Sequence, residues 1–193
     1  MMGEELNSSY VTERGLVGDR TYAVIDRKTG KVASAKNPRK WGKLFDSRSI
    51  FVDSPHDDDV NDIPAVRITL PDGSNIFSDH QDDTDSSLSK VFGREVRLVK
   101  ANNFEKLSYE EYWPDIEGLA QREKVTDEAM PSKTFFDIAV VHILTTSTIN
   151  RLRELYPEGR FKIRRFRPNI VIESPSASGG RMSSLRTHGW EKR

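Results

Sequence analysis

Short apolar runs separated by turn residues recur along the first hundred residues of the chain. Residues 21–26 (TYAVID) predict a strand and residues 31–35 its partner. Gly30 can adopt the positive φ that a hairpin turn at residues 26–30 requires. We expect further strands at residues 11–14, 48–52, 65–70, 75–77 and 94–99, a loop at residues 37–42 and a short helix at residues 82–92. Many short strands joined by tight turns are typical of a β-barrel or a sandwich.

A second patterned region begins after residue 134. Residues 139–144 (AVVHIL) are apolar and partly β-branched, which favours a buried strand. A helix is expected from residue 147 to residue 156, with Thr145 or Thr146 as its N-cap. Its apolar stripe is formed by Ile149, Leu152, Leu155 and Tyr156, and Pro157 and Gly159 end it.

Residues 161–172 (FKIRRFRPNIVI) alternate in a way that predicts another strand. On such a strand Arg165, Arg167 and Asn169 share one face, because side chains alternate across a strand. If that face is the inner one, the arginines need an anion opposite them. From the sequence alone, a carboxylate of the chain itself is favoured over the phosphate of a ligand, which arginine grips with two parallel hydrogen bonds. Pro168 indicates a strand edge or a bulge, and a bulge would change this alternation.

The polar residues 101–134 separate these two regions. Tyr109, Tyr112 and Trp113 lie there among charged residues, so we expect an inter-domain connection or a lid-like loop. The predicted domains are therefore residues 1–100 and 135–193, joined by residues 101–134. The run after Glu173, rich in Ser and Gly, predicts flexible coil.

Composition limits the function classes. The chain has 193 residues, with 30 Lys and Arg against 30 Asp and Glu, and this zero formal charge argues against a general nucleic-acid binder. It contains no cysteine, which excludes disulfides and thiolate chemistry within these residues. No run is long and apolar enough for a membrane span, and no signal-peptide core is present, so we expect a cytoplasmic protein. Asp57, Asp58 and Asp59 predict solvated loop charge, and His142 a core residue.

Two segments resemble a known family. The sequence RGLVGDRTYAVID resembles the start of the β-barrel domain that precedes MOSC domains, and FDIAVVHILTTSTINRL with RRFRPNIVI resembles the MOSC domain itself. The resemblance implies a mostly β fold with a few short helices, in which an N-terminal β-barrel domain is followed by an incomplete MOSC β-barrel domain. It also implies binding of the molybdenum cofactor (molybdopterin). Arg20 matches the arginine of the family's Asp-Arg pair, which contacts the cofactor, and Arg167 and Asn169 match residues that hold its phosphate and pterin. Arg165 joins them as a candidate because of the strand alternation.

The chain also departs from the family pattern. Relatives carry a downstream cysteine whose thiolate binds molybdenum, and a Lys-Ser pair near the start, and this sequence has neither in the matching place. We expect a fragment or a reduced homologue, whose full-length relatives transfer sulfur or reduce N-hydroxylated compounds with redox partner proteins. One alternative is a non-catalytic module that binds RNA or an acidic partner through Arg160, Lys162, Arg164 and Arg165. Another is an inactive truncated homologue.

Overall fold

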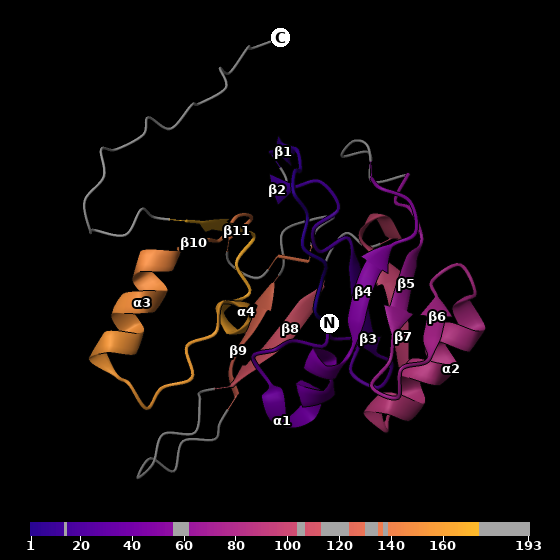
Figure 1. Ribbon diagram of the computed structural model, residues 1–193. Coiled ribbons are helices and arrows are strands. Elements are labelled where there is room, and N and C mark those ends of the chain that lie inside the picture. The colour runs from indigo at the N-terminus through magenta and orange to yellow at the C-terminus, as the bar shows by residue number, and fades with distance from the viewer. Residues whose placement is uncertain are drawn as a thin grey trace. The chain divides into compact units, whose positions relative to one another are not determined.

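The computed structural model describes residues 1–13, 15–55, 62–103, 107–112, 124–129, 135–136 and 139–173 (Figure 1). The chain divides into two units, Met1–Val140 and Val141–Arg193. The predicted domain limits at residues 100 and 134 stay a prediction. Each unit is described by itself below.

The strands of the first unit form several small sheets. A three-stranded antiparallel sheet contains β4 (Arg48–Phe51), β5 (Val66–Thr69) and β6 (Asn75–Phe77). Antiparallel pairs are formed by β3 (Tyr22–Asp26) with β7 (Val96–Lys100), β8 (Ser108–Tyr112) with β9 (Lys124–Ala129), and β1 (Val11–Thr12) with β2 (Gly15–Leu16). The helical elements are α1 (Pro38–Trp41), η1 (Gly42–Asp46), α2 (Gln81–Phe92) and η2 (Ala101–Asn103).

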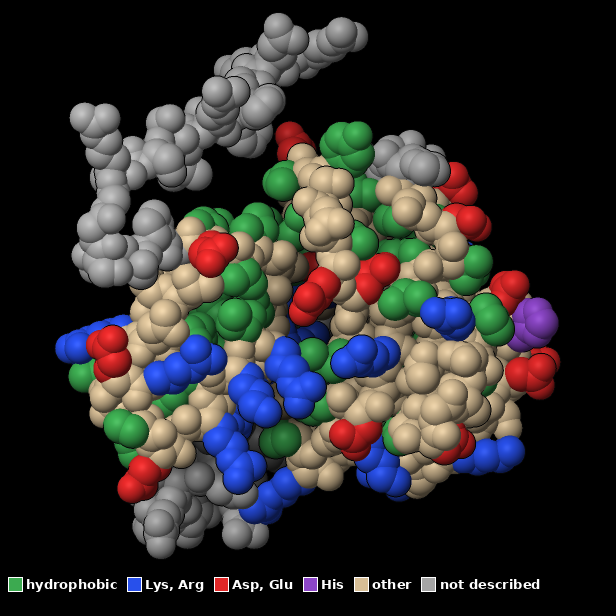
Figure 2. Space-filling view, in the orientation of Figure 1, with side chains coloured by type: hydrophobic (Ala, Val, Ile, Leu, Met, Phe, Trp, Pro, Cys, Tyr) green, Lys and Arg blue, Asp and Glu red, His purple; other side chains and the backbone are tan. Residues whose placement is uncertain are grey.

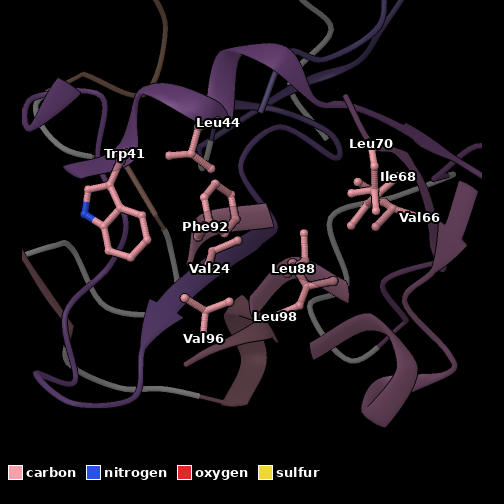
Figure 3. Packing of buried hydrophobic residues seen from close by; sticks show 10 residues of the cluster. All are labelled: Val24, Trp41, Leu44, Val66, Ile68, Leu70, Leu88, Phe92, Val96 and Leu98. Carbon is pink, nitrogen blue, oxygen red and sulfur yellow. The ribbon is translucent and has the colours of Figure 1, made fainter. Parts of the chain in front are cut away.

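The pair β3–β7 is buried on both faces. Val24 of β3 points into one cluster of apolar side chains, and its neighbours Ala23 and Ile25 point into a second. Successive side chains of β3 therefore alternate between the two apolar clusters. The first cluster joins the two strands to α1, η1, β5 and α2, and its members are Val24, Trp41, Leu44, Val66, Ile68, Leu70, Leu88, Phe92, Val96 and Leu98 (Figure 3).

Helix α2 contributes Leu88 and Phe92 to the first cluster. It lies beside β6 and β7 (Figure 1), and Leu88, which is fully buried, faces the core. Asp85 of this helix is also buried, and its carboxylate accepts hydrogen bonds from Arg27, from Gln81 and from the backbone N–H of Leu98. A buried carboxylate needs such donors, and these fasten α2 to both β7 and the segment after β3.

A cluster of charged side chains lies at the C-terminal end of β3. Lys40 Nζ lies 2.8 Å from the Asp26 carboxylate and 3.7 Å from that of Glu110. Burial alone would raise the pKa of Asp26, but hydrogen bonds from Lys40 and from the backbone N–H groups of Lys28 and Thr29 hold the pKa below its ordinary value. The cluster thus stabilises the ionised form of Asp26.

Several expectations for the first unit are corrected in detail. Residues 37–42 are not a loop, because Asn37 caps α1 by accepting from the backbone N–H of Lys40, with Pro38 in the first turn. In the predicted partner strand at residues 31–35, Val32 alone makes β-bridges, one to Ile25 and one to Tyr109. The hairpin turn is confirmed, with Gly30 at a φ of 70°. Among the described residues the sheets have two or three strands and do not close into a barrel.

The segment expected to connect two domains contributes to the first unit. Strands β8 and β9 lie within it, and Tyr109 of β8 is 1% exposed in the second apolar cluster. Apolar packing therefore explains Tyr109, and Trp113 lies outside the described residues.

The second unit is built around a parallel strand pair. It contains β10 (Ile143–Thr145), α3 (Thr146–Leu155), α4 (Ile163–Phe166) and β11 (Ile170–Ile172), and Ile143 of β10 pairs with Ile170 of β11. Helix α3 forms the crossover that a parallel pair requires. The Thr145 side chain accepts from the backbone N–H of Thr148, which confirms the predicted cap.

The long strand expected at residues 161–172 is the main error in this unit. Residues Ile163–Phe166 are one helical turn, and the strand begins only at Ile170. The predicted alternation of Arg165, Arg167 and Asn169 on one strand face is therefore wrong. The helical turn is followed by Arg167 in the left-handed conformation, which ends it.

Charged side chains of both signs are spread over the face of the first unit around β4–β6 and α2 (Figure 2). Of the helices within the described ranges, none combines the length and apolarity that crossing a membrane requires.

Candidate functional site

The Gly-Asp-Arg turn before β3 holds Arg20 in an unusual conformation. Gly18 has a φ of 81°, and a Cβ there would lie 2.7 Å from the ring of Pro55 and 2.8 Å from that of Phe51, so only glycine fits. Arg20 itself has a φ of 51°. Few non-glycine residues adopt this region without a local reason.

The side chain of Arg20 is held from two sides. Its guanidinium carbon lies 5.1 Å from the ring centroid of Phe136, which is 2% exposed, and its Nε lies 4.0 Å from the Asp19 carboxylate. The guanidinium is thus positioned by an aromatic face and a weak ion pair rather than extended into water. The sequence offers no spacing signal for Phe136, which follows Arg20 by more than a hundred residues.

Arg167 of the second unit has a positive φ, as Arg20 does. Its φ and ψ are 50° and 47°, and its backbone N–H donates to the carbonyl of Arg164. Pro168 follows it, and a residue before proline normally takes an extended conformation. In the described part of the chain, Arg20 and Arg167 are the only non-glycine residues with a positive φ.

Arg165 lies on α4 and is exposed. Its Nη1 donates to the carbonyl of Arg160 at 3.1 Å, so this side chain ties the helical turn to the loop before it. A structural role therefore accounts for part of the hydrogen-bonding capacity of Arg165, and the anion that the strand interpretation placed opposite it is not required.

Asn169 joins the start of β11 to β10. Its carboxamide oxygen accepts from the backbone N–H of His142 at 2.8 Å, and its own backbone N–H donates to the carbonyl of His142 at 2.8 Å. The oxygen takes part in this contact, and the –NH2 group supplies the hydrogen-bond donors of the Asn169 side chain. His142 is half-buried, and its backbone makes these contacts.

The residues of the second unit suit the anionic part of the molybdenum cofactor, which the sequence resemblance implies, better than its metal. Exposed Arg167 and the –NH2 of Asn169 are hydrogen-bond donors, which suit a phosphate and a pterin carbonyl. In the family that the sequence resembles, molybdenum binds a protein thiolate, and this sequence contains no cysteine. Within the described ranges no group of three or more His, Asp or Glu side chains is placed to hold a metal ion. Asp57, Asp58, Asp59 and His188 lie outside the described residues.

Comparison with known proteins adds no relative. No family model matches the chain, and searches of curated proteins and of solved structures found no match either. The interpretation of the site therefore depends on the residues themselves.

Proposed function

We propose that this chain is a MOSC-type protein whose second unit binds the phosphate-bearing pterin of the molybdenum cofactor. The observation that carries the proposal is the left-handed conformation of Arg167. A non-glycine residue in this region costs about 1–2 kcal/mol, and such residues cluster at functional sites. The sequence resemblance assigns the phosphate contact to this same residue.

Each candidate site residue of the second unit has a defined part in the proposal. Arg167 donates to the phosphate, and the –NH2 of Asn169 donates to an acceptor on the pterin while its oxygen keeps β10 and β11 together. Arg165 adds positive charge beside them. Arg20 lies in the first unit and is a candidate from the resemblance alone.

The proposed activity is binding, and no step at the metal is derived. When bound, the cofactor supplies the redox and sulfur-transfer chemistry that the relatives carry out. Because this chain has no thiolate, its own residues recognise and orient the ligand rather than bind the metal. Any reduction would also need the redox partner proteins that the resemblance implies.

Calorimetric titration with a 6-substituted pterin phosphate monoester tests the proposal. Arg167→Ala should weaken binding by at least about 10-fold, because a charge-assisted hydrogen bond contributes roughly 1.5–3 kcal/mol. Arg151→Ala is the matched control, since Arg151 is an exposed arginine of the same unit that pairs with Glu154 at 3.1 Å. Arg20→Ala is measured in the same way. Equal affinity of wild-type protein and Arg167→Ala would remove the basis of the proposal.

A further inference from the structure

The zero net charge of the chain conceals two units of opposite charge. Met1–Val140 contains 19 Lys and Arg against 26 Asp and Glu, a formal charge of −7. Val141–Arg193 contains 11 against 4, a formal charge of +7. Charge asymmetry of this size between the parts of a chain is typical of proteins that bind a polyanion through one part. The argument from net charge against nucleic-acid binding therefore does not apply to the second unit.

Four of these 11 cations lie in the segment that leads from α3 into the helical turn α4, which we call the basic loop (residues 156–165). The guanidinium of Arg153 on α3 donates twice to the carbonyl of Phe161, at 2.8 and 3.1 Å. Arg165 donates to the carbonyl of Arg160 at 3.1 Å. Two arginines thus fix the backbone of the loop from both ends, which leaves the remaining cations on a defined scaffold.

Three cations of the basic loop are available to a partner. Arg160, Lys162 and Arg164 are all exposed, and no carboxylate in the described part of the chain lies within ion-pair distance of any of them. By contrast, Arg151 on α3 is neutralised by Glu154. Among the residues that the structure describes, these three neighbouring cations of the basic loop therefore have no carboxylate partner.

Two aromatic rings lie within the same loop. Tyr156 is 57% exposed, and its ring meets that of Phe161 edge to face, with 6.4 Å between their centroids. Both rings close over Gly159: a Cβ at Gly159 would collide with Phe161 and would lie 2.7 Å from the Tyr156 ring. Phe161 and Gly159 thus hold the Tyr156 ring in place while the ring stays accessible to solvent.

We infer that the basic loop binds single-stranded nucleic acid. Arg160, Lys162 and Arg164 contact successive phosphates, and a base stacks on the ring of Tyr156. An accessible aromatic ring beside a patch of cations is the combination that single strands use, since every base offers a face for stacking. An acidic protein partner would need the cations but not the ring. A duplex keeps its bases stacked on one another, so it would gain nothing from Tyr156.

Fluorescence anisotropy with the full chain tests this inference, using labelled oligouridylate and oligothymidylate of about 12 nucleotides. The affinity should fall with salt, and the triple variant R160A/K162A/R164A should reduce the slope of log K against log salt by about 2, since each phosphate contact on a single strand contributes about 0.7. Arg151→Ala removes one charge from α3 and should leave the slope unchanged.

The ring is tested separately from the charge. Tyr156→Ala should weaken binding roughly 5- to 150-fold with little change in salt slope, and Tyr156→Phe should restore it, because stacking needs only the ring. Far-UV circular dichroism of each variant checks that the unit stays folded. Gly159→Ala is a second test of the Tyr156 ring, because the added methyl group displaces both rings without altering charge.

Three results would overturn the inference. These are no measurable binding, equal affinity for Tyr156→Ala and wild-type protein, or complete displacement of the oligonucleotide by an equal charge concentration of polyglutamate. The last result would assign the patch to an acidic protein. None of these variants changes Arg20 or Arg167, so the pterin titration is an independent test of the proposed function.

Discussion

Replacing Arg167 by glycine should stabilise the second unit relative to replacing it by alanine. Both variants lose the guanidinium, but alanine keeps the left-handed strain that Arg167 has at a φ of 50°. Relief of that strain is worth about 1–2 kcal/mol, and the greater freedom of glycine in the unfolded chain takes back roughly 0.4–1 kcal/mol. The net difference in the free energy of unfolding should therefore be about 1 kcal/mol in favour of glycine.

Urea unfolding followed by far-UV circular dichroism measures this difference. With a slope of roughly 1–3 kcal/mol per molar urea, the midpoint of Arg167→Gly should exceed that of Arg167→Ala by about 0.3–1 M. Arg165 provides the matched control, because it lies inside α4 and glycine is a poorer helix former than alanine by about 1 kcal/mol. The sign of the glycine-to-alanine difference should thus reverse between the two positions. The same sign at both would refute the backbone conformation on which the site depends.

Three further predictions concern stability. Asp85→Ala should lower the free energy of unfolding by roughly 1–3 kcal/mol in urea titrations, because the buried N–H of Leu98 loses its acceptor, whereas Asp85→Asn should cost less. Because the pKa of Asp26 is lowered in the folded protein, its contribution to the free energy of unfolding is present above the unfolded pKa of about 3.9 and disappears as pH falls through the folded pKa. Asp26→Asn should therefore reduce the loss of stability at acidic pH in a stability–pH profile. An unchanged loss would argue against the pairing with Lys40. Thr145→Ala should cost about 1 kcal/mol in thermal unfolding, and Thr145→Ser should recover most of it.

Local patterns predicted much of the fold. The apolar runs at β3 and β5, the turn at Gly30 and the capped helix α3 were expected near their observed places, because their signals lie within a few residues of each other. Helix α1 also has a local signal, Asn37 followed by proline at the first helical position, which the interpretation as a loop overlooked.

The candidate site was less predictable because its determinants are not local. Strand alternation at residues 161–172 assumes extended backbone, and Pro168 makes that assumption reasonable for Arg167, yet the chain folds into α4 and a left-handed residue. Likewise, Asn169 was expected to face a ligand, but its oxygen bonds to the backbone of His142, more than twenty residues away. Tertiary contacts of this kind outweigh the conformational preferences of single residues, and they produce no periodic pattern in the sequence.

The most direct test of the central claim compares two ligands on the wild-type protein: a 6-substituted pterin with a phosphate monoester and the same pterin without it. Our account predicts that the phosphorylated compound binds at least about 10-fold more tightly, since Arg167 meets the phosphate through charge-assisted hydrogen bonds. Equal affinities, or no binding of either compound, would contradict it.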